Sequence, residues 1–320
     1  MAEEYERIRS IVEAPLEEQY VSGHRTSRGC MPALAMRLIA KAAGPRTVIV
    51  GSTGCMYVAN TSYYTTPWAV PWIHTQLGAF ASAAIGTAAG YKAQKRKGKL
   101  KKEKINVIGI AGDGGGADMG LSALSGALTY TEYNFLCVIY DNESYANTGI
   151  QVSSLTPWGA LTTFSPGGKE RFFHRREKKN IMGIVAAHHT VKYIATATPG
   201  LPLDLMNKVR KALSTEGPTF LYVHTPCPKG WEYNHKDSRK IARLAVETGF
   251  IPMYEIENNE LKFTYKLKKR KPVKEYLKLQ GRFSQLTEED MDRIQKDIDR
   301  RWEEWIVPHT VPIKKESVLG

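Results

Sequence analysis

The chain has 320 residues, with 45 Lys and Arg against 32 Asp and Glu, so its formal net charge is +13. The start, MAEEYERIRS, is polar, and no run of eighteen apolar residues occurs, so neither a signal peptide nor a membrane span is indicated and we expect a cytoplasmic protein without a membrane partner. Four cysteines are too few for a secreted disulfide scaffold, which favours reduced thiols. Cys137 lies within the apolar run FLCVIY and is most simply a small buried residue.

Helical and strand patterns alternate along the chain. Thr287 is expected to cap the last helix, with Glu289 in its first turn. Alternating segments predict an α/β fold, a mostly parallel sheet with helices on both faces. No linker rich in Gly, Ser or Pro divides the chain, which favours one domain with extensions. We expect helices at residues 33–43, 77–94, 119–130, 202–214, 237–248 and 287–305, and strands at residues 47–50, 105–111, 135–140, 192–196, 219–224 and 262–266.

A glycine-rich loop follows the strand predicted at residues 105–111. Gly112, Gly114 and Gly115 let the backbone approach a ligand closely. The helix that follows would direct its positive N-terminal end at the same place. Asp113 lies among these glycines and would repel a phosphate unless a cation lay between them. Mg²⁺ is the natural cation, because it binds protein, phosphate and water oxygens together.

The next predicted strand, residues 135–140, leads into the sequence DNESYANTG. Asn142 can supply a neutral amide oxygen, and a backbone carbonyl near Ser144 can supply a further ligand. Both loops open at the carboxyl ends of parallel strands, where open α/β sheets bind ligands. Together they predict a metal-bound diphosphate. The alternative is two ordinary glycine-rich turns in which Asp113 caps a helix.

These motifs resemble the thiamine diphosphate and Mg²⁺ motif of thiamine-dependent enzymes, a GDG followed by an Asn-containing turn. The run DNESYANTGIQVSSLTPWGALTTFSPGGK, together with STGC, VPWIH and TPCPKGW, resembles more specifically the β subunit of the 2-oxoacid:ferredoxin oxidoreductases. Pyruvate:ferredoxin oxidoreductase is the best-known member of that family. The resemblance extends over most of the chain and implies the thiamine diphosphate-binding fold.

The resemblance also implies roles for individual residues. Asp113 and Asn142 would hold Mg²⁺ together with the carbonyl oxygen of Ser144. Asn147 and Thr148 would act in catalysis, facing the cofactor ring and the substrate. His74 in VPWIH would lie near the active site, and a capping or core histidine is the alternative. The implied cofactor-binding residues are Gly54, Cys55, Gly112, Asp113, Gly114, Gly115, Asn142, Ser144, Tyr145 and Asn147.

Three cysteines stand in loop-like contexts, and the family holds a 4Fe–4S cluster in the corresponding motifs. The resemblance therefore implies that Cys30, Cys55 and Cys227 bind an iron–sulfur cluster. Ser27 stands where the first cysteine of the family's C-x-x-C motif is expected. Three thiolates leave open a 3Fe–4S cluster, or a 4Fe–4S cluster whose fourth iron takes Ser27, His24, water or a residue of another chain. Three unrelated buried cysteines and a zinc site are the alternatives.

The function implied is oxidative decarboxylation of a 2-oxoacid, with electrons passing to the cluster and the acyl group to coenzyme A or water. An α subunit is expected to supply the glutamate that activates the cofactor, so the chain alone should be inactive. Other expected partners are γ and ferredoxin-like δ subunits and ferredoxin or an NAD-linked acceptor. Pyruvate is the default substrate, and branched, aromatic, dicarboxylic and oxalate-like 2-oxoacids stay open.

Residues 1–235 are expected to form the cofactor-binding α/β domain, including an N-terminal cluster-binding segment. Residues 236–320 are expected to form a C-terminal extension that packs on the same domain and on partner subunits.

Two other functions stay open. One is a thiamine-dependent decarboxylase or synthase without iron, which Ser27 favours and the three retained cysteines oppose. The other is nucleic-acid binding through the basic tracts at residues 95–104 and 266–271. No recognition motif accompanies these tracts, so we expect no nucleic-acid partner. Their charge also suits acidic partner chains such as ferredoxin, or a coenzyme A phosphate.

Overall fold

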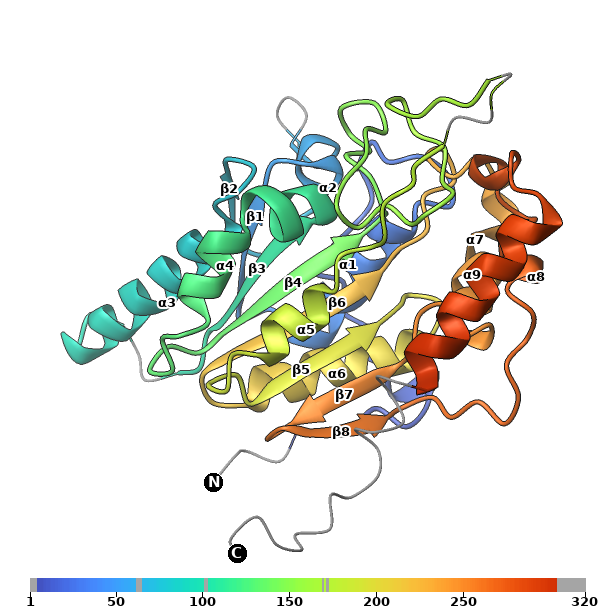
Figure 1. Cartoon of the computed structure of the whole chain (residues 1–320). Helices are drawn as coiled ribbons and strands as arrows, with labels where there is room; N and C mark the ends of the chain where they lie inside the picture. The colour runs from blue at the N-terminus through green and yellow to red at the C-terminus, as the bar shows by residue number, and fades with distance from the viewer. Residues whose placement is uncertain (1–4, 62–64, 101–102, 169, 171–172, 304–320) are drawn as a thin grey trace, which may run out of the picture.

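The computed structural model describes residues 5–61, 65–100, 103–168, 170 and 173–303, and one sheet forms its centre (Figure 1). The strands are β1 (Thr47–Ser52), β2 (Trp72–Thr75), β3 (Asn106–Gly112), β4 (Phe135–Asp141), β5 (Tyr193–Ala197), β6 (Pro218–His224), β7 (Tyr254–Glu257) and β8 (Glu260–Phe263). Their order in the sheet is β2-β1-β3-β4-β6-β5-β7-β8. The strands from β2 to β5 pair in parallel, and β7 and β8 are added antiparallel at one edge.

Successive side chains of the strands enter two different cores. In β4, Cys137 and Ile139 belong to the core on one face, whereas Leu136, Val138 and Tyr140 belong to the core on the other face. This is the period-two alternation of a strand, and here both faces are apolar because both are covered. Near-continuous apolar runs such as FLCVIY therefore predicted strands buried on both sides, and the structure confirms that expectation.

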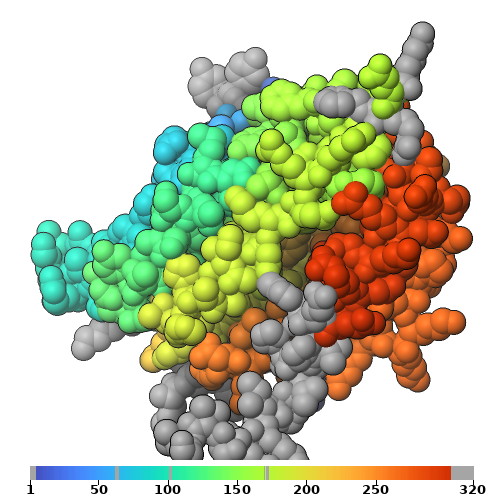
Figure 2. Space-filling model, in the orientation of Figure 1, coloured from blue at the N-terminus to red at the C-terminus, as the bar shows by residue number. Residues whose placement is uncertain are grey.

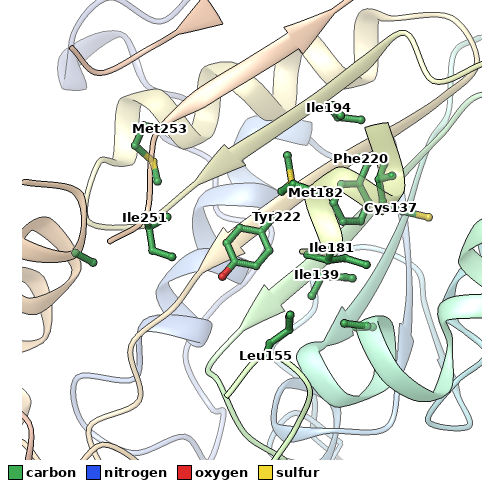
Figure 3. Close-up of a cluster of buried hydrophobic side chains, with 14 of the residues drawn as sticks. Cys137, Ile139, Leu155, Ile181, Met182, Ile194, Phe220, Tyr222, Ile251 and Met253 are labelled. Carbon is green, nitrogen blue, oxygen red and sulfur yellow. The ribbon is translucent and has the colours of Figure 1, made fainter. Parts of the chain in front are cut away.

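Helices cover both faces of the sheet (Figure 1). One face packs against α1 (Met31–Ala43) and α6 (Pro202–Ser214). The other face packs against α3 (Phe80–Arg96), α4 (Leu121–Ala127), α5 (Ile181–Ala186), α7 (Ser238–Glu247), α8 (Lys274–Leu277) and α9 (Glu288–Arg301). Shorter elements are α2 (Cys55–Val58), the π-helix η2 (Gly114–Met119) and the 3-10 turns η1 (Ile11–Glu13), η3 (His235–Asp237) and η4 (Gly281–Phe283). Figure 3 shows Ile181 and Met182 of α5 lying against Cys137, Phe220 and Tyr222 of the strands.

The sequence predictions hold for the long elements and miss several short ones. Residues 119–130 were expected to form one helix, but the π-helix Gly114–Met119 precedes a shorter α4. The strand expected at residues 262–266 is β8, Glu260–Phe263. The elements β2, β7 and α5 were not expected, because segments of four to six residues carry too little periodicity.

The last helix begins as expected. Thr287 caps α9 in a reciprocal pair of hydrogen bonds with Asp290, and Glu289 lies in the first turn. The helix ends at Arg301, and residues 304 and 305 of the predicted range lie outside the described residues. In the part of the chain that the structure describes, no helix combines the length and the apolar character that crossing a bilayer requires.

Candidate functional site

The loops that carry the predicted site residues meet at one edge of the sheet. Parallel pairing places Gly112 of β3 beside Tyr140 of β4, and Asp141 of β4 beside His224 of β6. The loops that follow β1, β3, β4 and β6 therefore begin side by side, at the carboxyl ends of these strands (Figure 1). This edge is where open α/β sheets bind ligands.

Three oxygen atoms converge there. The amide oxygen of Asn142 lies 3.2 Å from Oδ1 of Asp113 and 2.8 Å from the carbonyl oxygen of Ser144. None of these atoms carries a hydrogen in this orientation, so the three repel one another unless a cation lies between them. Neighbouring oxygens of octahedral Mg²⁺ lie about 2.9 Å apart, given bonds of about 2.0–2.1 Å. The spacing therefore fits the predicted magnesium ligands. If the oxygen and nitrogen of the Asn142 amide were exchanged, the nitrogen would instead donate hydrogen bonds to Asp113 and to the Ser144 carbonyl.

Asp113 is buried and held in one orientation. The hydroxyl of Ser153 donates a hydrogen bond to its Oδ2, which leaves Oδ1 facing Asn142. Burial and the nearby carboxylate of Asp141 raise the pKa of Asp113 well above its ordinary value, although the Ser153 hydroxyl opposes the shift. A bound cation would compensate both effects, so the ionised carboxylate is best accommodated when the metal is present.

Two glycines of the first loop are required by packing within the protein. A Cβ atom on Gly114 would lie 2.3 Å from the ring of Tyr145, and one on Gly115 would lie 2.8 Å from the carbonyl oxygen of Leu77. The hydroxyl of Tyr145 also donates to the carbonyl oxygen of Gly114, at 3.3 Å. Tyr145 thus joins the two loops, and the predicted contacts of Gly112, Gly114, Gly115 and Tyr145 with a cofactor stay predictions.

Among the buried hydroxyl groups without a partner in the described residues, two are of interest at this edge. They are Oγ of Ser52, at the end of β1, and Oγ of Ser144. The Ser52 oxygen lies 3.1 Å from the position that a Cβ atom on Gly115 would take. Buried polar atoms without partners commonly face a ligand or a water, so these hydroxyls suit a polar group such as a diphosphate.

An ionic network that the sequence analysis missed lies behind the metal ligands. Glu143 is buried and accepts from Lys178, at 2.5 Å, and from Arg282, at 2.6 Å. The same Lys178 lies 2.6 Å from Asp141, which also accepts a hydrogen bond from the hydroxyl of Tyr222. Burial would raise the pKa of Glu143, but Lys178 and Arg282 outweigh it and hold that pKa well below its usual range. Two acidic residues directly after a fully buried strand were the available signal, since buried carboxylates require cations.

The three predicted cluster cysteines are neighbours. Burial raises the pKa of Cys30 to about 11 and that of Cys55 to about 12, and Cys227 adds to both shifts through its charge. The charge of Asp113 contributes further to the raised pKa of Cys55. Cys30 caps the N-terminus of α1, and the Sγ of Cys227 accepts from the backbone N–H of Gly230 at 3.4 Å. Backbone donors of this kind stabilise metal-bound thiolates.

Within the described residues no three His, Cys, Asp or Glu side chains lie close enough to hold a single metal ion. A tetrahedral ion with metal–sulfur bonds of about 2.3 Å would draw its thiolates to within about 3.8 Å of one another. A polynuclear cluster separates its thiolates further, so neighbouring but spread thiols fit it better than they fit zinc. The oxygen triad of Asp113, Asn142 and Ser144 is not a group of this kind, because it contains one carboxylate, one amide and one backbone carbonyl.

The fourth ligand of a cluster is not evident. The side chain of Ser27 is exposed, and its carbonyl oxygen accepts from the N–H of Cys30 at 3.1 Å. The side chain of Thr26, not that of Ser27, lowers the pKa of the Cys30 thiol, against the larger effect of burial. Thr26 in turn lies 2.7 Å from Nδ1 of His24. Ser27 as a cluster ligand therefore stays a prediction.

The residues predicted to act in catalysis lie on the outer side of the site. Asn147 and Thr148 are exposed in the turn after β4, and Thr148 donates to Oε1 of Gln151 at 2.5 Å. His74 is exposed at the end of β2, with Nε2 2.9 Å from the hydroxyl of Thr53. Partial burial lowers the pKa of His74, which favours the neutral imidazole at pH 7.

A cavity of about 770 Å³ lies elsewhere, between α5, α9 and the sheet. Figure 2 shows it as a hollow between the yellow segment near residue 180 and the red helix α9. Its wall is mostly apolar and includes Trp158, Phe250 and Trp302, and Lys178 reaches it from the ionic network. None of the predicted site residues lines this cavity, so it is separate from the oxygens of Asp113, Asn142 and Ser144 and from the thiols.

Comparison with known proteins gives independent information. Residues 29–223, more than half of the chain, match the family described as thiamine pyrophosphate enzyme, C-terminal TPP binding domain. The chain is 51% identical over 292 residues to pyruvate synthase subunit PorB of Methanocaldococcus jannaschii, covering 91% of this chain and 97% of that protein. It is 40% identical over 300 residues to ketoisovalerate oxidoreductase subunit VorB of Pyrococcus furiosus, covering 93% and 96%.

A solved structure shares the fold. It is the 2-oxoglutarate:ferredoxin oxidoreductase from Magnetococcus marinus, with a TM-score of 0.51 and 18% sequence identity. The match covers 70% of this chain and 79% of that chain. At this identity the likeness supports the arrangement of sheet and helices and nothing finer.

Proposed function

This chain belongs to the family of PorB and VorB oxidoreductase subunits, which contain the thiamine pyrophosphate-binding domain, and on that premise we propose that it is the cofactor-binding β subunit of a 2-oxoacid oxidoreductase complex. The proposed reaction is oxidative decarboxylation of a 2-oxoacid, with electrons transferred to an iron–sulfur cluster and the acyl group to coenzyme A. Pyruvate is the proposed substrate, because the relatives named pyruvate synthase reach 51% and 47% identity, above the 40% of the ketoisovalerate enzyme.

One observation carries the proposal: the oxygens of Asp113, Asn142 and Ser144 converge at the carboxyl edge of the sheet, and the charges of Asp113, Cys30 and Cys227 all act on the half-buried thiol of Cys55. Mg²⁺ fits the triad by ligand type and spacing. Asp113 supplies one negative charge, whereas the amide of Asn142 and the carbonyl of Ser144 supply none. The two positive charges of Mg²⁺ would therefore be only half neutralised. The remainder attracts the oxygens of a diphosphate, for which the hydroxyls of Ser52 and Ser144 are further partners.

Thiamine diphosphate, when bound, supplies the electron sink that decarboxylation of a 2-oxoacid requires. The chain's own residues would bind this cofactor and orient it and the substrate. Asp113, Asn142 and Ser144 would hold the metal, and the π-helix Gly114–Met119 would place its first N–H groups near the diphosphate. Asn147 and Thr148 would present an amide and a hydroxyl to the substrate, and the neutral His74, oriented by Thr53, would accept or hold a proton at a ring nitrogen.

The thiols of Cys30, Cys55 and Cys227 would hold the cluster. Their raised pKa values mean that free thiols are favoured over thiolates until a metal binds. The exposed Ser27 favours a cluster with three protein thiolates, either 3Fe–4S or a 4Fe–4S cluster whose fourth iron takes a ligand from outside these three. The same exposure is the observation that favours the second candidate, a thiamine-dependent decarboxylase or synthase that lacks the cluster.

The site is proposed to be shared with a partner subunit. Asn147, Thr148 and His74 are exposed at its outer side, where an α subunit carrying the activating glutamate would cover them. Additional γ and ferredoxin-like δ subunits would carry electrons onward to ferredoxin or an NAD-linked acceptor in the cytoplasm. Residues 236–320 are proposed to be an extension of a unit spanning residues 1–235, and part of it packs on that unit through Arg282.

The test uses the complete complex, purified without oxygen. We expect thiamine diphosphate, magnesium, iron and sulfide in it, and reduction of ferredoxin when pyruvate and coenzyme A are added together. Ketoisovalerate and 2-oxoglutarate, assayed in parallel, decide the substrate. A complex without thiamine, or one that converts none of these acids, would refute the proposal.

A second experiment decides between the two candidates. Changing Cys30, Cys55 and Cys227 singly to serine should remove iron from this subunit while thiamine diphosphate stays bound. If the native complex contains thiamine but no iron attributable to this chain, the enzyme without a cluster is the better description. The reverse substitution, Ser27→Cys, should convert a three-iron EPR signal into a four-iron one if residue 27 stands at the vacant ligand position.

A further inference from the structure

Two consecutive lysines connect the ionic network to both loops of the site. They lie in the irregular segment before α5, where neighbouring side chains diverge. Lys178 lies 2.6 Å from Asp141, the last residue of β4, and 2.5 Å from Glu143 on the loop that follows. Lys179 lies 3.1 Å from Asp118 of the π-helix after β3. It also donates a hydrogen bond to the carbonyl oxygen of Ala117. One dipeptide therefore holds both loops.

On the side of Lys178, the residue that is held lies between two proposed metal ligands. Glu143 separates Asn142 from Ser144 in the chain and adopts a φ of 62°, a conformation that L-residues rarely adopt without support. Its backbone N–H donates to Asp141 at 2.7 Å, and its carboxylate is held by Lys178 and Arg282. Because Glu143 is fixed at both ends, the amide oxygen before it and the carbonyl oxygen after it are fixed as well.

On the side of Lys179, Asp118 is the point where the two loops touch. Besides Lys179 it accepts from the hydroxyl of Tyr145, at 3.2 Å, and from the N–H of Ser154, at 3.1 Å. Lys179 is also tied by its own N–H to the carbonyl oxygen of Ser154, at 2.8 Å. The π-helix that begins directly after Asp113 is thereby held against the segment that contains Ser153, the partner of Asp113.

We propose that Lys178 and Lys179 are positioning residues that hold the two loops in register, so that the oxygens of Asp113, Asn142 and Ser144 stay converged on one point. This inference rests on the proposed function, since convergence matters only if a metal and its diphosphate bind there. Neither lysine touches the oxygen triad, so both act through the residues that they hold. Contacts of this kind outside the direct ligands typically change metal affinity by about 10-fold to 100-fold.

The chain contains matched controls for both lysines. Lys211 also bridges two carboxylates, Glu255 at 2.9 Å and Glu257 at 2.8 Å, and its side chain is 15% exposed against 16% for Lys178. Lys41 resembles Lys179 in binding one carboxylate, Glu18 at 2.6 Å, and backbone carbonyl oxygens, those of Pro15 at 2.8 Å and Leu16 at 3.5 Å. Both controls lie outside the loops of the site, so they report the loss of similar contacts without a change at the triad.

The experiment measures how tightly the complete complex binds Mn²⁺, a spectroscopic substitute for Mg²⁺, after the bound cofactor has been removed. Binding is followed by EPR in the presence of thiamine diphosphate, and unfolding is followed separately. We expect Lys178→Gln and Lys179→Gln each to weaken Mn²⁺ binding by at least about 10-fold. Lys211→Gln and Lys41→Gln should also lower the melting temperature but keep Mn²⁺ affinity within about two-fold, because distant sites act independently. Lys178→Arg keeps the charge and should recover part of the lost affinity.

The outcomes separate this inference from the proposed function. If the unchanged complex binds Mn²⁺ no better than Asp113→Asn does, the proposed function fails. If the unchanged complex binds Mn²⁺ and folded Lys178→Gln and Lys179→Gln bind it equally well, only the positioning role fails. Equal losses in the lysine variants and their controls would also overturn it. Should Lys178→Gln not fold, the more exposed Lys179→Gln decides, and an unchanged affinity in that variant refutes the proposal.

Discussion

Two regions of this molecule contain the same set of contacts, a lysine that bridges two carboxylates and lies over a tyrosine ring, in different surroundings. Near the carboxyl edge, Lys178 bridges Asp141 and Glu143 and lies 5.7 Å above the ring of Tyr222. At the far edge of the sheet, Lys211 of α6 bridges Glu255 and Glu257, which are two positions apart in β7. Its Nζ lies 5.1 Å above the ring of Tyr193. In each region the tyrosine hydroxyl donates to the first carboxylate.

The two regions differ in burial and in what lies next to them. Both carboxylates at Lys178 have no exposed side-chain surface, whereas the side chain of Glu257 is 50% exposed. The first region has a second cation, Arg282, and its acidic pair is interrupted by the proposed metal ligand Asn142. The second joins a helix to an added strand. The same contacts therefore lie beside the proposed site in one place and far from it in the other, and burial decides how much their loss costs.

The largest expected difference comes from removing one acid from each pair. Glu143→Gln leaves Arg282, whose side chain is 3% exposed, without its carboxylate partner. Breaking a buried pair in this way typically costs about 3–5 kcal/mol of unfolding free energy. Glu255→Gln leaves Lys211 paired with the more exposed Glu257, and we expect a cost of about 1 kcal/mol. Chemical denaturation of the two variants measures both values, and equal costs would contradict the assignment by burial.

The next prediction separates stability from binding at the same edge. Asp113→Asn removes a carboxylate whose pKa is raised by burial and by Asp141, so the folded protein without cofactor should be no less stable than before. Loss of the only charged proposed metal ligand should weaken Mg²⁺-dependent cofactor binding by about 100-fold. Titration calorimetry and thermal unfolding of one preparation test the two statements. Reduced stability together with unchanged binding would show that Asp113 is structural.

Acid should weaken the buried network in a defined direction. Because Lys178 and Arg282 hold the pKa of Glu143 below its usual range, its stabilisation is complete above the unfolded-state pKa of about 4.3 and is lost as pH falls through the lower, folded-state value. The difference in melting temperature between the native protein and Glu143→Gln should be constant from about pH 5 to 8 and shrink below about pH 4. A difference that grows on acidification would contradict this direction.

The smallest effect is expected at an exposed ion-pair cluster on α1. Glu18 lies 2.7 Å from Arg37 and 2.6 Å from Lys41, and the hydrogen bond from Arg37 is the main cause that lowers its pKa to about 2. Solvent screens such pairs, so Glu18→Gln should cost only about 0.2–1 kcal/mol, and less in high salt. Unfolding at low and high ionic strength measures this. A cost approaching that of Glu143→Gln would mean that burial is not the deciding variable.

Much of the fold followed from local pattern. Apolar runs such as FLCVIY and INVIGIA indicated strands buried on both faces, and those strands are β4 and β3. The loops after them were expected to adjoin, and the oxygens of Asp113, Asn142 and Ser144 do converge. Prediction missed several short elements, such as β2 and α5, because four to six residues often hold too little periodicity. It also failed at the π-helix, whose glycines leave no pattern of buried faces.

The sequence by itself determined the class of fold and the edge of the sheet at which the two predicted loops meet. These properties are local, since they depend on strand periodicity and on glycine within short motifs, whereas the proposed cluster ligands came from the resemblance to a known family. Only the tertiary structure decided that Lys178 and Arg282 neutralise Glu143, because those residues lie 35 and 139 positions away in the chain. Partners of buried charges are chosen by packing in three dimensions, and no periodicity in the sequence records that choice.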